Sequence, residues 1–268
     1  MLPVDSAGDP DLRDPSIAGV HDYWLGGRYH SDADRDFADR TAIVAPQIPY
    51  LVRTQRALLG RMVRYLAGRG IRQFLDLGSG VPSVGHVHEV AQAIDPTARV
   101  VYVDTDPDVV AYSKDLLALN DNVALVDADV RDPRQVLDAP ETRRLLDLDQ
   151  PTAVLLIATL QHIPDTDDPA HMVTAYRDAL SPGSYLALSH YGPDEYLVSG
   201  QKLFERMHLG EKLEVTVRDP ESLRVLFAGL DLVSPGIVPV VSWRPDPDDD
   251  IGNNPERHPI HAGLGRKP

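Results

Sequence analysis

The stretch that decides the fold is FLDLGSGVPS, residues Phe74–Ser83. An apolar run ends here in Asp76, Gly78 and Gly80, and small residues at such a turn let the backbone approach a ligand closely. Ligands of open α/β sheets bind at the carboxyl ends of the strands. We therefore expect a nucleotide-like ligand at this turn.

The turn departs from the dinucleotide-binding pattern. A GxGxxG motif that began at Gly78 would need glycine where Ser83 stands, and Pro82 lies inside the turn. The carboxylate of Asp76 would repel a pyrophosphate but can accept a hydrogen bond from an ammonium group. A cationic ligand end is expected here, and an NAD-dependent oxidoreductase is the weakest alternative.

Beyond the turn, short apolar runs alternate with helix-compatible segments such as Pro107–Leu119 and Pro169–Leu180. This alternation predicts an α/β fold with a doubly wound, mostly parallel sheet that helices cover on both faces. The runs are IRQFLDL (71–77), RVVYVD (99–104), NVALVDAD (122–129), TAVLLIATL (152–160) and GSYLALSH (183–190).

The C-terminal part predicts two helices and two further strands. The helices are expected at 193–209 and at 219–230, where Asp219 would be the N-cap and Gly229 the end. A strand is expected at 230–243, broken at Pro235-Gly236, and a loop rich in Pro and Asp follows it. The final segment, 260–268, is expected to return as an antiparallel edge strand, which makes seven strands in all.

The N-terminal part differs in character. Residues 1–15 lack hydrophobic periodicity and predict a flexible arm. Apolar residues at helical spacing predict helices within 32–45 and 49–70. We expect residues 16–70 to form a helical lid over the core, 71–268, and to make one structural domain with it.

Composition excludes several function classes. The 268 residues carry 26 Lys and Arg against 41 Asp and Glu, a formal charge of −15 that disfavours nucleic acid and anionic membrane surfaces and favours a small-molecule substrate. The absence of cysteine excludes disulfides and thiolate chemistry, and no metal-ligand motif occurs. No apolar run could span a bilayer, so a cytoplasmic protein is expected. The sequence sets no oligomeric state.

Two more acidic residues follow the next strands. Asp104 ends the second strand, where a carboxylate usually holds a ribose diol. Asp129 ends the third, where it could accept a hydrogen bond from an adenine amino group. Each alone is more simply a helix cap, but Asp76, Asp104 and Asp129 in this order follow the amine, ribose and base of one ligand.

The chain resembles the Rossmann-like, class I S-adenosylmethionine-dependent methyltransferases. FLDLGSG, VVYVDTDP, DADVRDP, LLIATLQHIPD and LSPGSYLALSH match successive motifs of that superfamily. With DYWLGG, VHEVAQ and GLGRKP, they resemble a family of stand-alone bacterial methyltransferases from about Ile17 to the C-terminus. The sequence departs from this family at His30-Ser31, which replaces Asn-Phe, and at His86, which replaces Asn.

The resemblance implies S-adenosyl-L-methionine as cofactor and a set of residues that bind it. The glycine pair after DYWL would let the backbone turn against the ligand, and one cation of the first long helix would reach the cofactor carboxylate. The expected cofactor-binding residues are Tyr23, Gly26, Gly27, Arg56, Asp76, Gly78, Ser79, Gly80, Asp104, Thr105, Asp129, Val130 and Ala158.

The leading hypothesis is in-line methyl transfer to a small molecule, in which the protein mainly orients donor and acceptor. A general base is needed only for a protonated oxygen or nitrogen; His162 is the first candidate, followed by His190 and His30. Substrate contacts are expected from Trp24, His30, Gln161, His162 and Tyr191.

Two alternatives remain at the level of sequence. One is a homologue that binds S-adenosylmethionine or S-adenosylhomocysteine without turnover, and the other is an enzyme that uses the cofactor for chemistry other than methylation. The segment HDYWLGGRYHSDADR, residues His21–Arg35, is expected to be the wall between cofactor and substrate, with apolar surface from Tyr23 and Trp24, or else to attach the N-terminal helices to the sheet.

Overall fold

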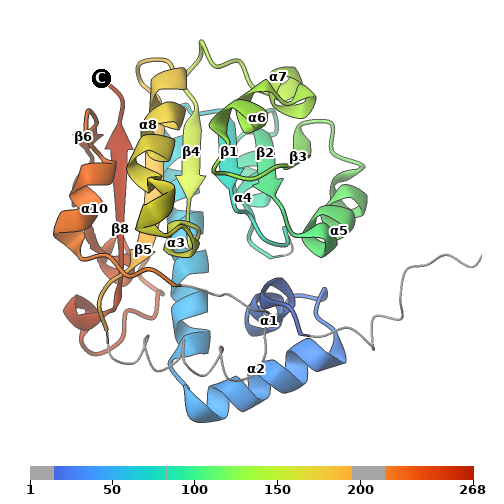
Figure 1. Ribbon diagram of the computed structural model, residues 1–268, viewed down its shortest axis with the longest axis vertical. Helices are drawn as coiled ribbons and strands as arrows, with labels where there is room; N and C mark the ends of the chain where they lie inside the picture. The colour runs from blue at the N-terminus through green and yellow to red at the C-terminus, as the bar shows by residue number, and fades with distance from the viewer. Residues whose placement is uncertain (1–14, 83, 195–214) are drawn as a thin grey trace, which may run out of the picture.

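A computed structural model describes residues 15–82, 84–194 and 215–268 (Figure 1). Its sheet has the strand order β3-β2-β1-β4-β5-β8-β6, and β7 also pairs with β8. The first five strands are parallel, as their near-continuous apolar sequences predict. The strands are β1 (Gln73–Leu77), β2 (Arg99–Asp104), β3 (Val123–Asp127), β4 (Ala153–Leu156), β5 (Tyr185–Tyr191), β6 (Asp231–Leu232), β7 (Val238–Pro239) and β8 (Ile260–Arg266).

Helices cover both faces of the sheet, which confirms the predicted doubly wound α/β fold (Figure 1). One face packs against α3 (Ile48–Ala67), α4 (Val87–Ile94) and α5 (Pro107–Leu117). The other packs against α6 (Pro133–Asp138), α7 (Pro140–Leu145), α8 (Pro169–Ala179) and α10 (Pro220–Leu226). Short 3-10 turns complete the described elements: η2 (Leu160–His162), η3 (Asp165–Asp167), η4 (Val240–Ser242) and η5 (Pro255–Arg257).

The C-terminal strand is antiparallel, as expected, but it is not an edge strand. β8 pairs with β5 from Tyr185↔Arg266 to Tyr191↔Ile260, and both β6 and β7 pair with β8 on its other side. The turn at Pro235-Gly236 splits the expected strand at 230–243 into these two short pieces. The sheet therefore has eight strands rather than seven, and β8 lies inside it.

Two N-terminal helices, α1 (Ile17–Trp24) and α2 (Asp32–Val44), lie beyond the carboxyl ends of the parallel strands (Figure 1). They form their own small core with one residue of α3, and we call α1 and α2 the cap. The apolar stripe of α3 that includes Leu58, Met62 and Leu66 packs instead in the core on the face of the sheet that α4 and α5 also cover. Of the expected lid at 16–70, the cap and the first turns of α3 lie at the sheet edge, and the rest of α3 packs against the face of the sheet.

Capping side chains define where several helices begin. Ser31 caps α2 by accepting from the backbone N of Asp34 at 3.2 Å, and Asp219 caps α10 through the backbone N of Ser222 at 2.7 Å. The helix α10 ends at Leu226, before Gly229. Most of the helix expected at 193–209 and nearly all of the expected N-terminal arm lie outside the described residues.

Candidate active site

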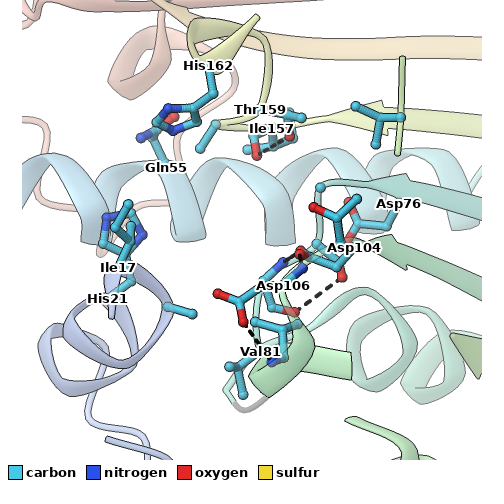
Figure 2. A pocket seen from close by; sticks show the side chains of 18 of the residues that line it. Ile17, His21, Gln55, Asp76, Val81, Asp104, Asp106, Ile157, Thr159 and His162 are labelled. Atoms are coloured by element: carbon cyan, nitrogen blue, oxygen red, sulfur yellow. Dashed lines mark hydrogen bonds between the residues drawn. The ribbon is translucent and has the colours of Figure 1, made fainter. Parts of the chain in front are cut away.

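A cleft of about 500 Å³ lies at the carboxyl edge of the sheet, between the strand tips and α1. The tips of β1, β2 and β3 line one part of it, and α1, α3 and the tip of β4 line the other. Figure 2 shows Asp76 and Asp104 at the first part and His21, Gln55 and His162 at the second. We call these parts the acidic half and the histidine half.

The glycine turn after β1 is fixed by close packing. Gly78 has a φ of +70°, and a Cβ there would lie 2.5 Å from Thr159 Cγ2. The backbone N–H groups of Gly78 and Ser79 both donate to the carbonyl of Val103, at 2.9 and 3.1 Å. Gly80 also has a positive φ, +62°, but a Cβ there would meet nothing within 4 Å. The turn is pinned to β2 and stays open toward the cleft.

The carboxylate of Asp104 holds the same turn from β2. It accepts hydrogen bonds from the backbone N of Gly80 at 2.7 Å and of Asp106 at 3.0 Å. Burial raises the pKa of Asp104, and these bonds act in the opposite direction. Asp106 caps α5 by accepting from the backbone N of Asp108 at 2.9 Å, so its carboxylate has a structural partner.

Asp76 is a buried carboxyl group at the end of β1, with 4% of its surface exposed. Burial raises its pKa to about 7, since the favourable charge of Arg56 only partly offsets desolvation and Asp104 adds repulsion. Burial lowers the pKa of Arg56, on which Asp76 is the largest opposing influence. The Arg56 guanidinium donates to the carbonyl of Val84 at 3.0 Å. This end of the cleft therefore contains a carboxyl group that titrates near neutrality.

Asp129 is held by its neighbour Arg131. The guanidinium donates to both carboxylate oxygens, with Nε 3.0 Å from Oδ1 and 2.9 Å from Oδ2 and with Nη2 2.6 Å from Oδ2, and the backbone N of Arg131 donates to Oδ1 at 2.8 Å. Arg131 also reaches Asp167 at 2.8 Å. These hydrogen bonds lower the pKa of Asp129, which stays ionised at the rim of the cleft.

The tip of β4 turns sharply at Ala158, whose φ of +62° is unusual for a residue other than glycine. Its N–H donates to Ser189 Oγ at 2.9 Å, and its carbonyl accepts from Gln161 Nε2 at 2.6 Å. Ser189 in turn donates to Gln55 Oε1 at 2.9 Å, which joins the tip to α3. These side chains hold the tip in the conformation that presents His162 to the cleft.

Two imidazoles enter the histidine half from opposite elements (Figure 2). His21 comes from α1, and burial lowers its pKa to about 4, with smaller effects of His162 and Arg56. His162 follows β4 and is exposed toward solvent, yet desolvation by the protein atoms around its ring lowers its pKa. Both rings are therefore neutral at pH 7.

The structure brings most of the expected cofactor residues into this one cleft. They come from the tips of four neighbouring strands and from α3. Those that line it are Arg56, Asp76, Gly78, Ser79, Gly80, Asp104, Thr105, Asp129, Val130 and Ala158, together with the candidate base His162.

Five expected residues of the DYWLGG region do not line the cleft. The Tyr23 hydroxyl donates to Asp39 on α2 at 3.0 Å, and Trp24 is buried in the cap core. His30 Nδ1 lies 3.2 Å from Asp22. A Cβ on Gly27 would fall 1.9 Å from the same carboxylate, while Gly26 supplies a positive φ for the turn. These five residues hold the cap together, whereas His21, Asp22 and Leu25 of the same segment line the cleft.

The other expected residues outside the cleft lining come from β5 and η2. His190 is fully buried and bonded to Arg218, so it is not placed to act as a base in the cleft. Gln161 supports the Ala158 carbonyl. The Tyr191 hydroxyl lies 3.5 Å from Gln55 Nε2.

Sequence reasoning missed the face of α1 that lines the cleft. It consists of positions 17, 18, 21, 22 and 25, a spacing that marks one side of a helix. On α3, Val52, Gln55, Arg56 and Leu59 follow the same rule, which selects Arg56 rather than Arg53. Helical spacing within residues 17–25 was the signal that could have identified His21.

Among the described residues, no group of three or more His, Asp or Glu side chains is arranged to hold a metal ion. No helix in these parts of the chain is long and apolar enough to cross a membrane.

Comparison with known proteins decides the family. A sequence model described as S-adenosyl methyltransferase matches residues 6–268. The chain belongs to the S-adenosyl methyltransferase family. It is a methyltransferase whose cofactor is S-adenosylmethionine, which confirms the cofactor and enzyme class expected from the sequence.

Solved structures similar to this S-adenosyl methyltransferase cover nearly all of it. A candidate methyltransferase from Thermobifida fusca is 41% identical with a TM-score of 0.85, and the match covers 99% of each chain. A DUF574 family protein from Streptomyces avermitilis is 35% identical with a TM-score of 0.87, over 97% of this chain and all of that one.

A curated relative matches a smaller part. The ornithine lipid N-methyltransferase of Singulisphaera acidiphila is 32% identical over 103 residues, which is 38% of this chain. The match spans about half of that relative, 49% of its length.

The cleft of this S-adenosyl methyltransferase suits the chemistry of its cofactor. S-adenosylmethionine offers an ammonium, a ribose diol and an adenine amino group, which are all hydrogen-bond donors, and the acidic half presents three carboxyl groups in a row. The space beyond Gly80 is open where a Cβ would project, which leaves room for close approach of a ligand.

Proposed function

We propose that this methyltransferase transfers the methyl group in line to a small molecule bound in the same cleft. The observation that carries the proposal is the continuity of one cleft from the strand-tip carboxylates to His21 and His162. Its volume of about 500 Å³ lies within the range of small-molecule sites, roughly 300–1,000 Å³.

The acidic half would hold the cofactor. Asp76 would accept from the ammonium and Asp104 from the ribose hydroxyls, each beside the open glycine turn. Asp129 has room for the adenine amino group, because Arg131 supplies three N–H donors to a carboxylate with about four acceptor sites. Arg56, which lines the cleft from α3, would face the cofactor carboxylate. Backbone and small side chains complete this half at Gly78, Ser79, Gly80, Thr105 and Val130, and Ala158 at the tip of β4 would contact the cofactor from the other half.

The histidine half would hold the methyl acceptor. S-adenosylmethionine supplies an electrophilic methyl group on its sulfonium when bound. Ile17, Leu25 and Val52 contribute apolar side chains to the lining of this half. A neutral imidazole can accept a proton from an oxygen or nitrogen acceptor. We assign that role to His162, with His21 as a second hydrogen-bonding group opposite it.

The test uses the full chain, methyl-labelled S-adenosylmethionine and a fractionated extract of small metabolites. We expect label to enter one fraction with equimolar formation of S-adenosylhomocysteine. Cofactor binding by calorimetry without turnover in any fraction would favour a binding protein. Release of methylthioadenosine would show different chemistry on the same cofactor.

Two variants separate base catalysis from proximity. His162→Gln should lower turnover about 10²-fold or more if a proton must be removed, with little change in affinity for S-adenosylhomocysteine. Arg53→Gln, an exposed position of α3 outside the cleft lining, is the control and should behave as wild type. Undiminished turnover in His162→Gln would remove the base assignment and leave methyl transfer by proximity alone.

A further inference from the structure

Arg218 is a buried arginine whose donors are all used. Only 8% of its surface is exposed, and it precedes α10 in the chain. Nε and Nη2 donate to Asp165 Oδ1 at 3.0 and 2.6 Å, and Nη2 also donates to the carbonyl of Ile163 at 2.9 Å. Nη1 donates to the carbonyl of Leu160 at 3.1 Å and to His190 Nε2 at 2.5 Å. Five contacts match the five N–H donors of a guanidinium.

Two of these hydrogen-bond acceptors lie on either side of His162 in the chain, the residue proposed to face the methyl acceptor. Leu160 and Ile163 flank Gln161 and His162, so the guanidinium holds the first carbonyl of the 3-10 turn η2 and the carbonyl of the residue that follows it. The backbone N of Thr216 donates to the carbonyl of Gln161 at 2.8 Å. The segment that carries Arg218 thus engages three of the four carbonyls from 160 to 163.

His190 anchors the other side of the guanidinium. Its Nδ1 lies 3.0 Å from the carbonyl of Tyr191, which can only accept, and its Nε2 faces Arg218, which can only donate. The partners therefore assign the neutral tautomer with the proton on Nδ1. Burial lowers the pKa of His190 to about 4, in agreement with a neutral ring. The backbone N of Arg218 also donates to the carbonyl of Tyr191 at 2.9 Å.

We propose that Arg218 is the positioning residue that holds His162 against the acceptor in the cleft. This role rests on the proposed function of His162. The contacts of Arg218 with Leu160, Ile163, Asp165 and His190, which we call the clamp, do not depend on that function. Lysine could not replace Arg218, because an ammonium has three donors and no planar fork, whereas the guanidinium of Arg218 serves four acceptor atoms, so at least one of them would lose its partner.

Arg61 offers a matched control at a distance from the cleft. It is also buried, at 5% exposure, and its guanidinium donates to the carbonyls of Trp243 at 3.0 Å and Val240 at 2.6 Å and to Asp249 at 2.5 Å. It does not line the cleft. Arg61→Lys therefore removes a buried fork of the same kind without touching η2.

The experiment compares Arg218→Lys, Arg61→Lys and wild type as full chains with isotope-labelled histidine. Loss of one imidazole signal in His162→Gln assigns His162 in the spectrum. We expect Arg218→Lys to shift or broaden that signal and Arg61→Lys to leave it in place, while both variants lose thermal stability. The affinity of both variants for S-adenosylhomocysteine should stay within about twofold of wild type, because neither substituted side chain shares a contact with the proposed cofactor-binding residues.

An unchanged His162 signal in Arg218→Lys, or an equal change in Arg61→Lys, would overturn the proposal. If Arg218→Lys does not fold, Asp165→Ala replaces it, because that side chain is 79% exposed and its loss frees two of the five donors. The His162 signal should then move less, and no movement would contradict the clamp. If His162→Gln keeps full turnover while the signal still moves in Arg218→Lys, only the base assignment fails.

Discussion

The two halves of the cleft are built by different means. In the acidic half, the ligand-facing groups stand at the ends of adjacent parallel strands, and hydrogen bonds from backbone N–H groups, such as Gly80 N to the Asp104 carboxylate, fix them. In the histidine half, the groups come from α1, from α3 and from η2, which are far apart in the sequence. The first half depends on strand registry, and the second depends on which face of each helix packs inward.

This difference shows what fixes the position of the ligand-facing side chains in each half. A carboxylate at a strand end is placed by the sheet ladder itself, so its position follows from the strand. A helix residue is placed by the packing of its helix against other elements, as Trp24 and Phe37 in the cap core fix α1 and with it the position of His21 at the cleft. The predictions below test the two halves in turn.

The largest effect is expected for Gly78→Ala. A Cβ would overlap Thr159 at 2.5 Å and force a left-handed residue, so unfolding free energy should fall by about 2–5 kcal/mol. Gly80→Ala, with a similar φ and no neighbour within 4 Å, should lose only about 1–2 kcal/mol. Chemical denaturation measures both variants, and equal losses would show that Thr159 does not confine the turn.

A smaller effect is expected for Asp104→Asn. The variant loses one charged acceptor for the ribose hydroxyls, so affinity for S-adenosylhomocysteine should fall by about 1–3 kcal/mol in calorimetry. Asp106→Asn is the control, because Asp106 lines the same cleft but caps α5. It should keep its affinity, and unchanged binding in Asp104→Asn would end the ribose assignment.

The pH dependence of binding should follow Asp76. Its pKa of about 7 means that the free protein carries a proton there below pH 7. A bound ammonium favours the ionised carboxylate, so binding releases the proton and affinity falls as pH drops below 7, by up to about tenfold per pH unit.

Calorimetry at pH 6 in buffers of different ionisation enthalpy measures this proton release. Asp76→Asn should bind more weakly and show no buffer dependence. A binding enthalpy of the wild type that does not vary with buffer would contradict the pairing of Asp76 with the ammonium.

The smallest effects separate the two faces of α1. Tyr23→Phe removes a hydroxyl that bonds Asp39 outside the cleft, so stability and turnover should stay within about 0.5 kcal/mol of wild type. His21→Gln should raise the acceptor KM by the loss of one hydrogen bond, about 0.5–1.5 kcal/mol. Steady-state kinetics on the labelled fraction compares them, and a stronger effect of Tyr23→Phe would reverse the assignment of faces.

The sequence predicted the parallel sheet and the acidic half for one reason. Apolar runs of strand length followed by Asp76, Asp104 and Asp129 place these groups at one edge, whatever the details of packing. The β8 position was less predictable, because an inner place depended on two-residue strands around Pro235-Gly236 that have no pattern of their own.

The DYWLGG region was interpreted by residue type rather than by spacing. Aromatic and glycine residues suggested a ligand wall, but Tyr23, Trp24 and Gly27 pack against the cap itself. The inward face of α1 includes His21. The prediction for His190 was wrong for a related reason, because its place near the end of β5 gave no sign of Arg218, which lies 28 residues later in the chain.

Two glycines of the cap each lie against a buried carboxylate: Gly19 against Asp34 and Gly27 against Asp22. These four positions should evolve slowly, because any side chain on either glycine would displace a charge with several hydrogen bonds. Positions 17, 18, 21 and 25 face the cleft and are under no such restraint. Among homologues, differences in substrate range should therefore be found at positions 17, 18, 21 and 25, while the rest of the helix stays constant.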